Sequence, residues 1–166
     1  CELMSTFDKI TRAAGAAGFI TLGGFHPRSL DVVPSLRNGD KPSTVVLLGN
    51  TGASMWAPFR EALSSLPGEH PLDDWTRSCV GPVAEEFGAD VIYPFDGPPY
   101  HPFQKWASRS AAVEPSPLGL FIHATFGMWF GLRGALLLGQ VIDVPTRDNS
   151  DSPCLSCIER PCLHTC

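Results

Sequence analysis

Residues 116–139 read SPLGLFIHATFGMWFGLRGALLLG, and this stretch decides how the rest of the chain is interpreted. Two apolar runs, 118–122 and 135–138, flank a polar and aromatic centre that is interrupted by glycines. Continuous apolar runs of this kind are typical of strands buried on both faces, although periodicity alone does not exclude a helix. We therefore expect a buried hairpin whose glycines leave room for a ligand or another backbone to approach closely.

Four side chains in the polar centre are candidates for binding, and each also has an ordinary structural interpretation. The preferred interpretation of His123 is a core histidine whose ring forms hydrogen bonds with the backbone. Phe126 and Trp129 are equally compatible with ordinary core packing. Arg133 is the exception, because a buried arginine between apolar runs needs a partner. A ligand carboxylate, a phosphate or an amide side chain would serve as that partner, and so would a structural Asp or Glu.

Outward from this stretch, predicted helices and strands alternate, which indicates an α/β sandwich. The strand candidates are residues 19–22, 44–48 and 89–94, and the helix candidates are residues 6–18, 55–66 and 71–87. Gly23-Gly24 is expected to form a turn or a point of close approach, and Gly49–Ser54 a small-residue loop between strand and helix. That loop lacks both the Walker ending and the G-x-G-x-x-G pattern, so a plain turn is preferred over a phosphate loop.

Length and composition favour a folded protein of ordinary domain size. The chain has 166 residues, of which 43% are hydrophobic and 17% charged. A formal net charge of −5 without a basic stripe argues against a nucleic-acid partner. Charged and polar residues break the longest apolar stretch, and no basic segment precedes an apolar run, so we expect neither a membrane span nor a signal peptide. A cytoplasmic protein is the expectation, and a homodimer is left open.

The cysteines cluster at the C-terminal end, which favours a metal over disulfides. Cys154, Cys157, Cys162 and Cys166 have the spacing Cys-x2-Cys-x4-Cys-x3-Cys. This pattern is closer to a ferredoxin run than to two zinc knuckles, so a 4Fe–4S cluster is the leading interpretation. Zinc is the next alternative, followed by incidental cysteines, and Cys166 is the least secure ligand. Since the chain starts and stops on a cysteine, we expect both ends to be trimmed.

The segment Ile122–Leu138 resembles the Ile-His-Pro-Arg-Phe-Gly-Gly-Trp-Phe-Ala-Ile-Arg-Gly segment of the CblC-type cobalamin-processing family. Shorter matches occur in the same order at similar spacing, at Phe25-His26-Pro27, Pro71-Leu72-Asp73, Tyr100-His101-Pro102 and Val141–Pro145. The similarity thus spans residues 19–145. The cysteine tail instead resembles the cobalamin-dependent epoxyqueuosine reductases, in which a related module precedes ferredoxin-like clusters.

The resemblance implies a nitroreductase-like α/β sandwich at residues 1–145, which binds a corrinoid in the base-off form. Residues 146–166 would be a linker and a ferredoxin-like iron–sulfur segment. The implied corrinoid-binding residues are Tyr100, His101, Phe103, Gln104 and Trp106 from one loop, and His123, Phe126, Trp129 and Arg133 from the central stretch. The implied activity is reductive removal of the upper ligand of cobalamin, or a cobalamin-dependent reduction, with a redox partner or reductant as electron source.

Two departures limit what the resemblance implies. Ala124-Thr125 stands where the CblC segment has Pro-Arg, which weakens the implication of thiol-dependent dealkylation. No residue matches the general acid of the epoxyqueuosine reductases, so we expect no queuosine chemistry on transfer RNA. Two alternatives from other classes stay open. One is an iron–sulfur electron-transfer or interaction module without corrinoid chemistry, and the other is a flavin-dependent reductase on the same fold.

Overall fold

A four-stranded antiparallel sheet forms the centre of the protein. The computed structural model describes residues 4–66, 68–110, 113–145 and 153–165. The strand order is β1-β2-β6-β3, and the strands are β1 (Ile20–Phe25), β2 (Thr44–Thr51), β6 (Phe130–Leu138) and β3 (Asp90–Ile92). Every neighbouring pair runs antiparallel. Helices accompany this sheet, so the mixed α/β class expected from the sequence is confirmed.

The two central strands are apolar on both faces, because the sheet is covered on both sides. In β2, Val46 and Leu48 enter one core cluster, whereas Val45 and Leu47 enter the other. The second half of β6 alternates in the same way, from Ala135 to Leu138. This explains why residues 44–48 and 135–138 form uninterrupted apolar runs, as strands covered on both faces do.

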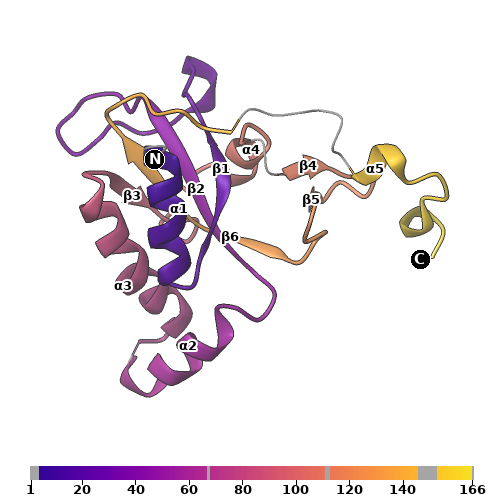
Figure 1. Ribbon diagram of the computed structural model, residues 1–166, viewed down its shortest axis with the longest axis horizontal. Coiled ribbons are helices and arrows are strands. Elements are labelled where there is room, and N and C mark those ends of the chain that lie inside the picture. The colour runs from indigo at the N-terminus through magenta and orange to yellow at the C-terminus, as the bar shows by residue number, and fades with distance from the viewer. Residues whose placement is uncertain (1–3, 67, 111–112, 146–152, 166) are drawn as a thin grey trace.

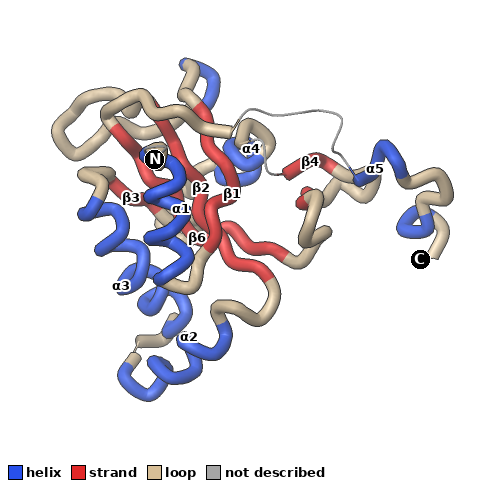
Figure 2. The backbone as a smooth tube through the Cα atoms, in the orientation of Figure 1, coloured by secondary structure: helices blue, strands red, loops and turns tan. Residues whose placement is uncertain are grey.

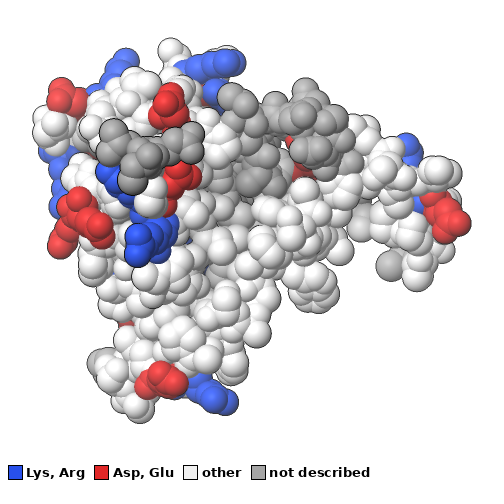
Figure 3. All heavy atoms as spheres, in the orientation of Figure 1, with Lys and Arg blue, Asp and Glu red and all other residues white. Residues whose placement is uncertain are grey.

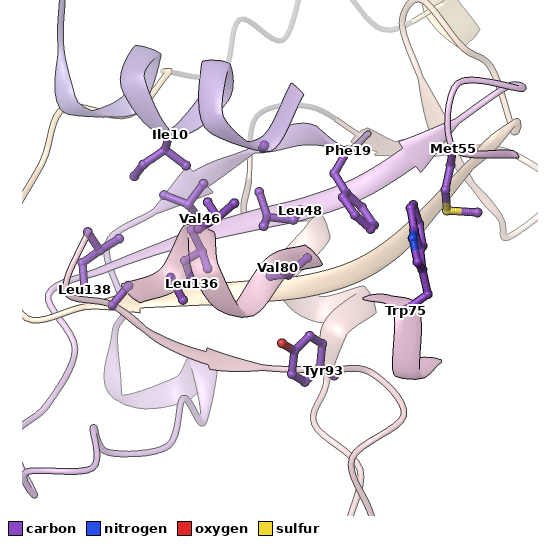
Figure 4. Packing of buried hydrophobic residues seen from close by; sticks show 14 of the residues in the cluster. Ile10, Phe19, Val46, Leu48, Met55, Trp75, Val80, Tyr93, Leu136 and Leu138 are labelled. Carbon is purple, nitrogen blue, oxygen red and sulfur yellow. The ribbon is translucent and has the colours of Figure 1, made fainter. Parts of the chain in front are cut away.

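Two helices, α1 (Thr6–Ala16) and α3 (Pro71–Glu86), cover the first face of the sheet, as Figure 1 and Figure 2 show. A third helix, α2 (Trp56–Ala62), lies below the sheet in the same view and contacts α3. Ser5 caps α1 by accepting a hydrogen bond from the amide of Asp8. Pro71 occupies the first turn of α3, where its missing N–H costs nothing. Phe19 stacks on Trp75 at 5.2 Å between ring centres, in the core shown in Figure 4.

The opposite face carries α4 (Phe103–Ala107), whose Trp106 is fully buried. The Trp106 ring nitrogen donates to the carbonyl oxygen of Asp31 at 2.7 Å. The carboxylate of Asp31 in turn accepts from Nη1 of Arg109 at 2.7 and 2.8 Å. Asp31 belongs to a short 3-10 turn, η1 (Ser29–Asp31), so these bonds join that turn to the end of α4.

The prediction that the two apolar runs, 118–122 and 135–138, form one hairpin is wrong. The second apolar run lies in β6, but β5 (Phe121–His123) pairs with β4 (Val113–Pro115) in a separate two-stranded sheet. The first run is only partly a strand, because residues 118–120 form a turn in which Leu118 and Leu120 are exposed. Leucines in an exposed turn have the same composition as a buried strand, so the apolar run alone did not distinguish them.

The remaining elements differ from expectation mainly at their ends. β2 continues through Gly49 to Thr51, and Gly23-Gly24 lies inside β1 at a register irregularity, not in a turn. The expected helix 55–66 divides into α2 and the 3-10 turn η2 (Leu63–Ser65). Two short helical turns, α5 (Pro153–Ser156) and η4 (Pro161–Leu163), complete the described chain. None of the helices in the described ranges combines the length and apolar character that membrane crossing requires.

Candidate functional site

The partner of Arg133 is Asn50, which lies on the neighbouring strand β2. Nε of Arg133 donates to Oδ1 of Asn50 at 2.7 Å. In the β2–β6 ladder Asn50 pairs with Gly131, two residues before Arg133 and therefore on the same face of the sheet. Of the partners that the sequence allowed, the protein thus provides an amide side chain, and no carboxylate forms an ion pair with Arg133 among the described residues.

Glycines allow the two strands to approach each other closely at this point. A Cβ atom at Gly49 would lie 2.4 Å from the carbonyl oxygen of Gly131, and one at Gly131 would lie 2.9 Å from Oδ1 of Asn50. The ladder register also shifts between Leu48 and Gly49. Gly49 thus permits the close approach of the Gly131 backbone, whereas the space beside Gly131 is occupied by the side chain of Asn50.

Beside this pair lies an open hollow of about 300 Å³. Its lining residues are Asn50, Gly52, Met128, Trp129, Phe130, Gly131 and Arg133. Arg133 is half-buried there, and burial lowers the pKa of its guanidinium, while the carboxylate of Asp73 acts in the opposite direction. The hollow therefore combines an aromatic rim with a partly desolvated cation.

Trp129 forms the rim of the hollow and is 81% exposed. Its side chain is therefore not part of the core, contrary to the ordinary interpretation of this aromatic residue. The backbone around it is held from β2, because the Thr51 hydroxyl donates to the carbonyl oxygen of Trp129 at 3.0 Å. An exposed indole on an anchored backbone offers a flat apolar face and one N–H donor to a ligand.

His123 organises the turn that leads from β5 toward Trp129. Its Nδ1 accepts from the amides of Thr125 at 3.0 Å and Phe126 at 3.4 Å. An accepting Nδ1 places the proton of the neutral ring on Nε2. Burial lowers the pKa of His123, which favours that neutral form, and its ring centre lies 4.6 Å from that of Phe126. The backbone-satisfied histidine expected from the sequence is thus present, although it is only half-buried.

The aromatic loop before β4 contributes both exposed and buried side chains. Tyr100 is 67% exposed and Gln104 is also exposed, whereas Phe103 and Trp106 are buried. His101 is half-buried and stacks on Trp106 at 5.8 Å between ring centres. Among the predicted corrinoid contacts, Phe103 and Trp106 therefore support the loop from inside the core, while their neighbours reach the surface.

The loop and the central stretch meet at one apolar cluster. Phe103 and Trp106 are members of the cluster on the α4 side of the sheet, and Phe121, Phe130 and Leu132 pack against it. The surface above the β5–β6 connection is uncharged in Figure 3, whereas charged side chains gather over α1 and α3, the tip of α2 and the C-terminal tail. The structure thus joins α4 to β5 and β6 at this cluster, whereas the hollow at Arg133 has no lining residue from the aromatic loop.

The cysteine tail is not assembled as a metal centre among the described residues. Cys154, Cys157 and Cys162 are free thiols that are half-buried or exposed, and Cys166 lies outside the described residues. No three His, Cys, Asp or Glu side chains in the described ranges are grouped to hold a metal ion. The donors suit a soft metal by their chemistry, but binding would require residues 153–165 to rearrange.

Sequence reasoning missed Asn50 and the Asp31–Arg109 pair. Asn50 was assigned to a loop, yet a polar residue directly after the buried run 44–48 is a signal that could have marked it. Asp31 and Arg109 are separated by 78 positions and share no motif, so no signal in the sequence joins them. No family model and no curated protein sequence matches the chain.

Proposed function

We propose that this protein binds a corrinoid across the surface formed by Tyr100, His123, Trp129 and Arg133, and that it takes part in reductive corrinoid chemistry. The observation that carries the proposal is the meeting of the aromatic loop and residues 121–133 at one apolar cluster. Ligand sites of this kind combine apolar and aromatic walls with a few placed polar groups. The sequence resemblance to the CblC-type family supports the same ligand.

The size of the hollow restricts how such a ligand would lie. A volume of about 300 Å³ is at the lower limit for small-molecule pockets. It would accept a peripheral group of the corrinoid, while the flat macrocycle would lie over the exposed aromatic side chains. Trp129 and Tyr100, at 81% and 67% exposure, offer apolar area without disturbing the core.

His123 would act in this site as a hydrogen-bond donor, not as a ligand to cobalt. Its Nδ1 already accepts two backbone N–H groups, so Nε2 carries the proton. This residue would therefore not place an imidazole on cobalt, and the base-off form is the one that the resemblance to the CblC-type family implies. When bound, the corrinoid would supply a cobalt centre whose upper ligand is released on reduction, with electrons from an external reductant or from an iron–sulfur cluster in the same chain.

Binding is tested by equilibrium ultrafiltration of the purified protein with cyanocobalamin. We expect Trp129→Ala to weaken retention of cobalamin about tenfold, because an aromatic contact of this size contributes about 1–2 kcal/mol. Trp56→Ala is the matched control, since Trp56 on α2 is also exposed, at 55%, and lies outside the site. Equal retention by both variants would contradict the proposed surface.

The cysteine tail supports a second candidate, an iron–sulfur electron-transfer module. Its observation is the set of three accessible free thiols at ferredoxin-like spacing. Anaerobic reconstitution with iron and sulfide would give the visible absorbance of a cluster in the wild type and lose it in a Cys157→Ser variant. Cluster absorbance without cobalamin retention would favour this candidate over corrinoid binding. Zinc retention without cluster absorbance would instead indicate the tetrahedral alternative.

A further inference from the structure

The hollow beside Arg133 contains hydrogen-bond donors that lack acceptors. A guanidinium has five N–H donors and no acceptor. Only Nε of Arg133 has an acceptor among the described residues, namely Oδ1 of Asn50. The four N–H groups on the two terminal nitrogens therefore remain available to a ligand. This fork of parallel N–H groups matches the geometry of a carboxylate or phosphate.

Asn50 adds donors and fixes their direction. Because Nε of arginine can only donate, the atom of Asn50 that faces it must be the amide oxygen. The Nδ2 group of Asn50 is then directed away from Nε, and within the described residues it has no acceptor. Asn50 is thus both a second donor at the hollow and a positioning residue that holds the guanidinium in place.

The charge around the hollow favours a negatively charged ligand. No acidic side chain lines it, and the carboxylate of Asp73, which acts on Arg133, lies outside the lining. Arg133 is the single charged residue between Glu114 and Asp143. A ligand that only donates hydrogen bonds would leave the free N–H donors of Arg133 and Asn50 without acceptors. A neutral amide would add no negative charge beside the half-buried guanidinium beyond that of Asp73. A carboxylate or phosphate oxygen satisfies the donors and the charge together.

We propose that Arg133 and Asn50 form an oxoanion-binding subsite that takes a carboxylate or a phosphate group. It deepens the proposed function, because a corrinoid with its nucleotide tail carries such a phosphate, but the subsite also stands without a corrinoid. Gly131 leaves the space that the Asn50 side chain needs. A methyl group at position 131 would lie 2.9 Å from Oδ1 of Asn50 and would displace the residue that positions Arg133.

The test is a titration of the ¹⁵N-labelled full chain, monitored by the NMR signal of the Arg133 side-chain Nε–H. Inorganic phosphate and acetate are the two probes, and chloride at equal ionic strength is the control. We expect a saturable shift with phosphate, acetate or both, and none with chloride; the responding probe identifies the class of anion. No saturable shift with either probe up to about 50 mM, where millimolar affinity would be evident, overturns the proposal.

Two variants separate anion binding from folding. Asn50→Asp places a carboxylate against Arg133, so the variant should keep the fold. It should weaken binding of the anion that responds in the titration at least about tenfold, as expected for loss of a charge-assisted hydrogen bond. Gln140→Glu is the control of equal net charge, because Gln140 is exposed and lies outside the hollow. Equal affinities in the two variants would contradict the assignment of Asn50 and Arg133.

The source of the anion is distinguished with two corrinoids. Cobalamin carries the nucleotide phosphate, whereas cobinamide lacks it. Weaker binding of cobalamin but unchanged binding of cobinamide in Asn50→Asp would assign the phosphate to the corrinoid. Unchanged binding of both corrinoids, with loss of the phosphate or acetate response, would assign the subsite to a separate anion. If the wild type binds neither corrinoid but shows the anion response, the proposed function fails and the subsite stands.

Discussion

Asp31 and Arg109 show how much one buried contact determines on the α4 side of the protein. Asp31 is 2% exposed, and its side chain also accepts from the amide of Arg28 at 2.7 Å. Its carbonyl oxygen holds the ring of Trp106, and the guanidinium of Arg109 lies over Phe25 at 5.3 Å from the ring centre. The conformation of the aromatic loop therefore depends on this carboxylate and its cation.

Removing the guanidinium of Arg109 should lower the stability of the protein. Arg109→Ala leaves the buried carboxylate of Asp31 without its counter-charge, so we expect the free energy of unfolding to fall by about 3 kcal/mol or more. Arg37→Ala is the matched control, because the Arg37 side chain pairs with Asp90 while 80% exposed, and its loss should cost less than about 1 kcal/mol. Urea denaturation of the two variants measures the difference. Equal losses would show that burial does not govern the Asp31 pair.

His123 predicts a dependence of stability on pH. Burial lowers its pKa in the folded protein, so the unfolded chain binds the proton more readily. The contribution of His123 to the free energy of unfolding is complete above the ordinary histidine pKa of about 6.5. It is lost as the pH falls through the lower pKa that His123 has in the folded protein. His123→Asn retains an acceptor for the turn amides but does not titrate. Urea denaturation between about pH 7.5 and pH 5 should therefore show a steeper loss for the wild type, and parallel curves would contradict this account.

At the scale of elements, the contact between β2 and β6 fixes the position of the site. Gly49 and Gly131 bring these strands together, and Asn50 and Arg133 follow from the same register. The Arg133–Asn50 part of the hollow is therefore a consequence of strand pairing, whereas the lining residues Gly52, Met128 and Trp129 lie outside the strands. Any side chain that separates these strands should disturb both stability and the Arg133–Asn50 bond.

Two glycine-to-alanine variants test this directly. A Cβ at Gly49 would lie 2.4 Å from the Gly131 oxygen and from Cδ1 of Leu22, so Gly49→Ala should lower the free energy of unfolding by about 2 kcal/mol. Gly81 lies inside α3 with open space around it, and Gly81→Ala should raise stability by about 0.5–1 kcal/mol. Thermal denaturation of both variants shows whether each substitution raises or lowers the stability of the protein. A stable Gly49→Ala protein would contradict the close approach of the strands.

The sequence predicted elements better than their pairing. The apolar runs 44–48 and 135–138 predicted buried strands, and Pro71 and Gly88 correctly delimited the longest described helix, α3. The partner of β5 could not be predicted, because Val113-Glu114-Pro115 has no strand signature of its own and periodicity does not specify which strands pair. For the same reason Arg133 was recognised as needing a partner, but Asn50, 83 positions away, was not identified.

At the scale of the whole molecule, the α/β body and the cysteine tail have different organisation. The body has core clusters on both faces of its sheet, whereas the described tail, residues 153–165, contributes no buried residue. Figure 1 shows the tail at the opposite end of the protein from α1 and α3, beyond β4 and β5. A segment without a core acquires a fixed fold when a metal joins its ligands. The iron–sulfur proposal therefore belongs to the tail and the corrinoid proposal to the body.

The most direct test of corrinoid binding is the visible spectrum of cobalamin titrated with the anaerobically purified protein. The account predicts a saturable shift toward the base-off spectrum, the form that the resemblance to the CblC-type family implies, and no spectrum of a histidine-bound cobalt, because Nε2 of His123 carries the proton. It also predicts that Trp129→Ala weakens the shift while Trp56→Ala leaves it unchanged. A spectrum identical to that of free cobalamin at every protein concentration would contradict the proposed function.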